Sequence, residues 1–132
     1  MQDGGEVVWR DDFARVIIAA DADHPGFCRV VLEKHVKEMT DLSAPEQSRL
    51  MNIVFALESA QRELLRPDKI NLASLGNQVP HLHWHVIPRF VGDPHFPNPT
   101  FGLKSGGSAR AVPRDYAQSL SRELARRLGR DS

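Results

Sequence analysis

The sequence predicts an α+β domain, in which an antiparallel sheet of about five strands carries one long helix and a C-terminal helix. Three observations support this fold class. Short runs rich in Val, Ile, Leu and aromatic residues recur along residues 6–90, and a helical repeat of apolar residues fills 43–66. The strand-like runs 69–75 and 81–90 are separated by a short turn, which is typical of an antiparallel pair.

Length and charge limit the possible organisation and partners. The 132 residues fit one domain, 1–132, that is long enough to bury a core. Seventeen basic and seventeen acidic residues balance, so no overall field attracts nucleic acid or an anionic membrane. We therefore expect neither of these partners, and any anion site must be local.

Cysteine usage and the N-terminus predict the compartment. Cys28 is the only cysteine, which excludes an internal disulfide and a multi-cysteine metal site, and its apolar neighbours predict a buried thiol. The N-terminal stretch MQDGGEVVWRDD is acidic without an apolar core, and no apolar run in the chain approaches the ~18 residues of a membrane helix. We expect a cytoplasmic protein.

The first part of the chain predicts three strands. Runs of β-branched and aromatic residues at 6–10 and 13–20 flank the polar pair Asp11-Asp12, which predicts a hairpin. The stretch DADHPG at 21–26 is rich in turn-forming residues. A third strand is expected at 27–33.

The longest helix is predicted over 43–66. Ser43 and Glu46 have the spacing of a capping box, and Pro67 follows the last periodic residue. The apolar repeat on which the prediction depends consists of Leu50, Val54, Leu57, Ala60 or Gln61, and Leu64.

The most informative stretch is HLHWHVIPRF at 81–90. Its three histidines alternate with apolar residues, and alternate side chains of a strand point to the same face. One face of this strand would thus carry three imidazoles and the other would pack on the core. Three buried imidazoles would need three separate hydrogen-bonding solutions, so a functional site is favoured over a structural role. The three histidines are His81, His83 and His85.

Two kinds of chemistry suit three imidazoles on one face. Neutral imidazoles are good zinc ligands, but a catalytic zinc site normally has a further ligand from elsewhere and a supporting carboxylate. The nearby turn offers Gly-Asn-Gln instead. Alternatively, a neutral imidazole can attack phosphorus through one ring nitrogen while the other donates its proton to a fixed acceptor. The middle histidine, His83, has a neighbour on either side to position phosphate oxygens and transfer protons.

Phosphoryl transfer also needs hydrogen-bond donors around the nucleophile. Asn71, Asn77 and Gln78 are suitable donors on the strand and turn before the histidines. Asn and Gly are also ordinary turn residues, so each of these amides is equally consistent with a turn role.

The last part of the chain changes in character. The segment 92–107 contains three prolines, several glycines and two phenylalanines, and it predicts an ordered loop that acts as a lid or binding segment. A closing helix is predicted over 113–128. Its apolar stripe consists of Tyr116, Leu120, Leu124 and Leu128.

These motifs together resemble one family. HLHWHVI resembles the signature of the histidine triad (HIT) superfamily, His-φ-His-φ-His-φ-φ, where φ is hydrophobic. The stretch NLASLGNQVPHLHWHVIPR is similar to that family's strand, phosphate-binding turn and catalytic strand. HPGFCRVVLEKHVKEMTDLS is similar to its Pro-Gly turn, strand and Lys-His exit before the long helix. The likeness covers residues 13–90, favours the hydrolase branch typified by Hint and Fhit, and is weak beyond 92.

The resemblance implies nucleotide chemistry. The middle histidine, His83, would attack the α-phosphorus of a nucleotide and form a nucleotidyl-histidine intermediate that water releases. His81 and His85 would support phosphate binding and protonation of the leaving group. Because the uridylyltransferase branch carries Gln at the third position, His85 favours hydrolysis over transfer to a sugar phosphate.

The resemblance also assigns binding residues. Asn71 falls where relatives place an Asn or Gln near the phosphate, and Asn77 and Gln78 fall on the turn before the triad. Asp21 or Asp23 lies near a ribose-binding position, and the two cannot be separated on sequence. The last assignment, Phe27, replaces the histidine of many relatives after the Pro-Gly turn, which implies packing against a base in place of a polar contact.

The sequence therefore predicts hydrolysis of a dinucleoside polyphosphate or a nucleoside phosphoramidate, with a purine nucleotide favoured. No cofactor or metal is required for the covalent step, and the resemblance implies that the chain can form a homodimer. Two other functions stay open. One is a nucleotide-binding regulator with little turnover, and the other, less favoured, is a zinc-dependent hydrolase.

Overall fold

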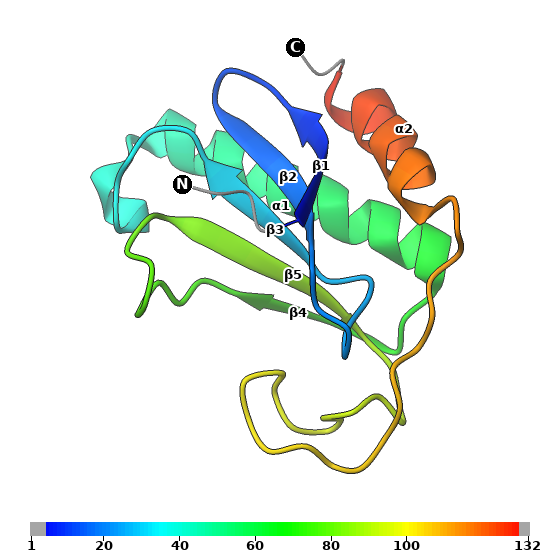
Figure 1. Ribbon diagram of the computed structural model, residues 1–132. Helices are drawn as coiled ribbons and strands as arrows, with labels where there is room; N and C mark the ends of the chain where they lie inside the picture. Colours follow the sequence, from blue (N-terminus) through cyan, green and yellow to red (C-terminus); the bar gives the residue numbers. More distant parts are fainter. Residues whose placement is uncertain (1–4, 130–132) are drawn as a thin grey trace.

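The computed structural model describes residues 5–129, so the outermost residues of the predicted domain lie outside the described part. Its centre is one antiparallel five-stranded sheet with the strand order β1-β2-β3-β5-β4 (Figure 1). This confirms the predicted α+β fold class. The strands are β1 (Gly5–Arg10), β2 (Ala14–Ala19), β3 (Cys28–Leu32), β4 (Lys69–Ala73) and β5 (His83–Arg89).

The long helix α1 (Ala44–Leu65) begins where the sequence predicts. Ser43 is its N-cap, and the side chain of Ser43 accepts a hydrogen bond from the backbone N–H of Glu46 while the Glu46 carboxylate accepts one from the N–H of Ser43. This reciprocal capping satisfies two helix-end donors. The helix ends at Leu65, and the C-cap residue Arg66 has a left-handed φ of 50° before Pro67.

Both helices pack on the same face of the sheet. Helix α1 contacts β3 and β5, and the C-terminal helix α2 (Tyr116–Leu128) packs against α1 and β1 (Figure 1). The indole N–H of Trp9 donates to the carbonyl oxygen of Gly129 at 3.2 Å, which ties the end of α2 to β1. The opposite face of the sheet carries neither helix.

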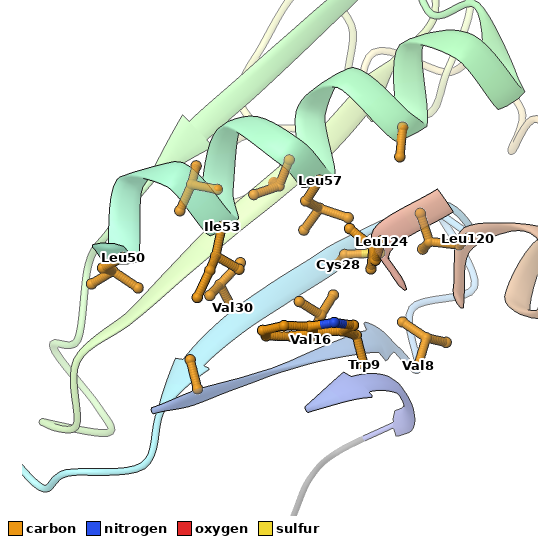
Figure 2. Packing of buried hydrophobic residues seen from close by; sticks show 14 of the residues in the cluster. Val8, Trp9, Val16, Cys28, Val30, Leu50, Ile53, Leu57, Leu120 and Leu124 are labelled. Carbon is orange, nitrogen blue, oxygen red and sulfur yellow. The ribbon is translucent and has the colours of Figure 1, made fainter. Parts of the chain in front are cut away.

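The main core fills the space between the sheet and the helices (Figure 2). Alternate residues of the strands supply one side of it, and the apolar stripes of the helices supply the other. A smaller apolar cluster, Ala19, Phe27 and Ile87, lies on the opposite face of the sheet. Residues labelled in the main core include Val16, Cys28, Val30, Ile53, Leu57, Leu120 and Leu124.

Several strands and helices are shorter than the sequence predicts. Strand β5 begins at His83, so His81 precedes the strand, and α2 begins at Tyr116. Residues 90–115 form no helix or strand, in line with the expected loop. Within the described residues, no helix is both long and apolar enough to cross a bilayer.

Candidate active site

His83 opens strand β5 with its ring fixed by the backbone. Its Nδ1 lies 2.6 Å from the carbonyl oxygen of His81. A carbonyl oxygen can only accept, so Nδ1 carries the donated proton and Nε2 of the neutral ring keeps its lone pair. The hydroxyl of Ser74 donates to the carbonyl oxygen of His83 at 2.8 Å and joins this strand end to the neighbouring turn. His83 is therefore oriented as a nucleophile or base through Nε2.

His85 lies on the same face as His83, one strand repeat further on. The two rings meet edge to face with centroids 4.9 Å apart, and Phe27 contacts His85 in the same way at 5.3 Å. Burial lowers the pKa of His85 to about 4, and electrostatic repulsion from neighbouring ionisable groups, among them Arg29, adds to this effect. The Nδ1 of His85 is buried without a hydrogen-bond partner among the described residues.

His81 has different surroundings. Its Nε2 lies 2.5 Å from the carbonyl oxygen of Leu32, so Nε2 is the protonated nitrogen, and its Nδ1 lies 2.8 Å from Nδ1 of His35. The rings of His81 and His35 are 5.1 Å apart. The structure thus brings His83 and His85 into mutual contact, whereas His81 contacts His35. His35 is not among the predicted site residues, although the Lys-His exit after the third strand pointed to it.

Asn71 is positioned by the strand pairing of β4 and β5. It lies opposite Ile87, on the histidine face of the sheet. Its side-chain oxygen accepts a hydrogen bond from Nη1 of Arg89 at 2.8 Å. A guanidinium only donates, so the atom of Asn71 that faces Arg89 must be the amide oxygen. The NH2 group of Asn71 is left to donate elsewhere.

Arg89 is itself held by a buried carboxylate. Its Nε and Nη2 donate to the two oxygens of Asp93 at 2.8 and 3.0 Å, and both side chains are about 2% exposed. Burial alone would raise the pKa of Asp93. Hydrogen bonds from Arg89 and from three backbone N–H groups outweigh it and hold that pKa well below its usual range.

Four other predicted site residues lie outside the strands. Asn77 and Gln78 are exposed in the turn between β4 and β5. The carboxylate of Asp21 accepts from the backbone N–H groups of Asp23 and His24 at 3.0 and 3.2 Å, which is a turn-forming role. Asp23 forms an exposed ion pair with Lys104 at 3.3 Å.

Phe27 is 6% exposed, and a cation lies over its ring. The guanidinium carbon of Arg29 is 5.2 Å from the ring centroid. The base contact expected from the sequence would need this cation to move away from the face of the ring. Arg29 is a second residue that the sequence analysis did not assign to the site.

Two cavities lie near β5, one beside His81 just before the strand and one beside Arg89 at its end. One of about 690 Å³ is lined by His81, His35 and the ion-paired Arg15 and Glu33. Another of about 610 Å³ lies along β4 and is lined by Asn71 together with aromatic and proline residues of the following loop, among them Phe96, Pro97, Pro99 and Phe101. Across residues 5–129, no three His, Cys, Asp or Glu side chains are grouped to hold a metal ion.

Curated relatives share sequence with most of the chain. An AP-4-A phosphorylase of Mycobacterium tuberculosis is 28% identical over 131 residues, which is 92% of this chain and 64% of the relative. A bis(5'-adenosyl)-triphosphatase of Saccharomyces cerevisiae is 28% identical over 98 residues, 67% of this chain and 48% of the relative. The chain therefore spans about half to two thirds of the length of these relatives.

Solved structures match nearly the whole chain. A histidine triad protein of Sinorhizobium meliloti superposes with a TM-score of 0.74 at 25% identity and covers 95% of this chain and 90% of its own. One from Bradyrhizobium japonicum has a TM-score of 0.72 at 29% identity, with coverages of 93% and 91%. The sequence model of the HIT domain matches residues 2–92, which include all three histidines. With its triad at the start of β5, this chain belongs to the HIT domain family.

Proposed function

We propose that the protein is a nucleotide hydrolase that attacks the α-phosphorus of its substrate with Nε2 of His83. The observation that carries the proposal is the hydrogen bond from Nδ1 of His83 to the carbonyl oxygen of His81. It directs the lone pair of the neutral ring to Nε2 and stabilises the positive charge that develops when that nitrogen bonds to phosphorus.

The reaction divides into two displacements. In the first, Nε2 of His83 forms a bond to phosphorus, the bond from phosphorus to the leaving group breaks, and the leaving group keeps the electron pair. In the second, water attacks phosphorus, loses a proton, and the phosphorus–nitrogen bond breaks, which restores the neutral imidazole. The NH2 group of Asn71 is offered to phosphate oxygens, and the ring of His85, which contacts His83, is the imidazole next to the leaving group.

The names of the curated relatives support the substrate class. Two relatives are named for adenosine dinucleotides with three or four phosphates. We propose a dinucleoside polyphosphate or a nucleoside phosphoramidate as the substrate of this chain. The cytoplasmic location and the homodimer expected from the sequence stay predictions.

Substitution of His83 tests the nucleophile. His83→Ala should lower kcat for a diadenosine polyphosphate by at least about 10³-fold, because it removes the ring nitrogen that forms the bond to phosphorus. Thermal unfolding should show that the variant stays folded. After wild-type protein is mixed with substrate and quenched without acid, mass spectrometry should show a covalently added nucleoside monophosphate that the variant lacks.

Activity of His83→Ala within tenfold of wild type would contradict the proposal. Tight nucleotide binding by calorimetry without turnover of any tested nucleotide would instead identify a nucleotide-binding protein with little catalysis.

A further inference from the structure

Arg29 lies directly beside His85, one of the two histidines in contact. The register of β3 and β5 pairs Arg29 with His85, and the side chains of directly paired residues point to the same face of a sheet. Arg29 is half-buried on that face. A permanent positive charge therefore lies beside His85, whose ring contacts His83.

The guanidinium of Arg29 is held by an aromatic ring. It lies over Phe27, 5.2 Å from the centroid, and the rings of Phe27 and His85 meet edge to face with centroids 5.3 Å apart. Stacking on an aromatic ring uses the flat face of a guanidinium and leaves the N–H groups at its edge free to donate. The guanidinium of Arg29 thus lies over Phe27 and makes no side-chain hydrogen bond within residues 5–129.

Arg29 differs from the buried arginines in lacking a carboxylate partner. Arg15 pairs with Glu33 at 3.0 Å and Arg89 pairs with Asp93 at 2.8 Å, whereas no carboxylate within residues 5–129 lies in ion-pair range of Arg29. A half-buried cation without a counter-charge attracts an anionic ligand, and the guanidinium fork matches the geometry of phosphate oxygens.

We propose that Arg29 contacts the phosphate oxygens of the leaving group and makes the site prefer phosphoanhydride substrates over phosphoramidates. This inference rests on the proposed function, and it selects one of the two substrate classes that the function leaves open.

The chemistry of the first displacement explains the preference. When the bond between the α-phosphorus and the bridging oxygen breaks, the electron pair stays on a leaving polyphosphate, whose negative charge rises. With its pKa near 4, His85 is neutral at pH 7, so Arg29 is the fixed cation beside it. A phosphoramidate instead releases an amine, which takes up a proton and leaves without negative charge. Arg29 therefore stabilises the first leaving group and has little effect on the second.

The test compares two substrates across matched arginine variants. Arg110 is the control, because its guanidinium also stacks on a phenylalanine, 4.7 Å from the Phe90 centroid, without an ion pair among the described residues. The kcat/KM of the full chain is measured with diadenosine tetraphosphate and with an adenosine phosphoramidate. The proteins are wild type, Arg29→Gln, Arg29→Lys and Arg110→Gln.

Arg29→Gln should lower kcat/KM for diadenosine tetraphosphate about 10- to 100-fold. The same substitution should lower kcat/KM for the phosphoramidate by less than about threefold. Arg29→Lys should fall between wild type and Arg29→Gln on the first substrate, because it keeps the charge but loses the fork. Arg110→Gln should leave both values unchanged. Equal losses on both substrates in Arg29→Gln, or no loss on either, would overturn the inference.

A binding measurement separates this inference from the proposed function. If wild-type protein hydrolyses neither substrate, the proposed function fails, and calorimetry with AMP and ATP then tests Arg29 alone. The gain in affinity of ATP over AMP should shrink at least about fivefold in Arg29→Gln and stay unchanged in Arg110→Gln. An equal gain in wild type and Arg29→Gln would overturn the phosphate contact.

Discussion

At the scale of single residues, three histidines with identical spacing have three different environments. His81 is held by the backbone of β3 and by His35, His83 by the carbonyl oxygen of His81, and His85 by ring contacts alone. His81 and His83 each donate a hydrogen bond to a carbonyl oxygen, and this bond defines which ring nitrogen carries the proton. The backbone therefore sets the chemistry of these two side chains.

The pH dependence of stability should report on His85. Its pKa is about 4 in the folded protein against 6.5 ordinarily, so between these values the unfolded chain binds the proton more readily. At pH 7 His85 is neutral in both the folded and the unfolded protein. As the pH falls from about 6.5 towards 4, the unfolded chain takes up the proton first, so the free energy of unfolding decreases. After allowance for partial exposure, we expect His85 to account for about 1–2 kcal/mol of this loss.

Urea unfolding at pH 7 and at pH 4.5 measures this contribution. Acidification should lower the free energy of unfolding less in His85→Gln than in wild type, and the difference should equal the contribution expected from His85. His24 is also buried with a lowered pKa and remains in both proteins, so its contribution cancels in the comparison. An identical loss in both proteins would show that His85 titrates normally.

At the scale of elements, helix α1 supports the strand that carries the site. The side chain of Gln61 is completely buried, and its NH2 group donates to the carbonyl oxygens of Gly26 and Val86 at 3.1 and 3.2 Å. The helix is thereby joined to β5 and to the turn before β3. Apolar packing around Leu57 adds to this attachment.

Two substitutions in α1 should separate packing from capping. Leu57→Ala leaves a cavity at a fully buried position and should lower the free energy of unfolding by about 3–4 kcal/mol. Ser43→Ala removes one exposed capping bond and should lower it by only about 1 kcal/mol. Chemical denaturation measures both values. A larger effect for Ser43→Ala would mean that the helix end, and not its buried stripe, limits stability.

At the scale of the whole molecule, the segment after β5 is tied to the sheet by buried charge. Asp93 accepts hydrogen bonds from Arg89 and from the backbone N–H groups of Phe90, His95 and Phe96. His24 adds a buried contact, with its Nε2 2.9 Å from Nδ1 of His95. Because Arg89 also holds Asn71, the loop and a candidate phosphate contact share one anchor.

Asp93→Asn should therefore weaken both stability and the site. It leaves Arg89 buried without a counter-charge, which should lower the free energy of unfolding by about 3 kcal/mol or more. Limited proteolysis within 94–107 should become faster. Asp12→Asn is the control, because Asp12 is exposed, pairs with Arg49 at the surface, and should change stability by less than about 0.5 kcal/mol. Equal stability of the two variants would contradict a central role for the buried pair.

The sequence by itself determined those features that depend on spacing along the chain. The alternation of His81, His83 and His85, the capping pair Ser43 and Glu46, and the apolar stripe of α1 are local patterns, and each specifies its element without knowledge of its neighbours. The fold class followed from these elements because a single sheet and two amphipathic helices can bury all their apolar faces by packing in two layers.

The tertiary structure alone decided what surrounds the histidines. The insertion of β5 between β3 and β4 brings Arg29 opposite His85 and Asn71 opposite Ile87, and the end of β3 brings His35 to His81. These pairings join residues that are far apart in the sequence. They depend on strand order and register, which the buried faces of the whole sheet fix together and which no local spacing encodes.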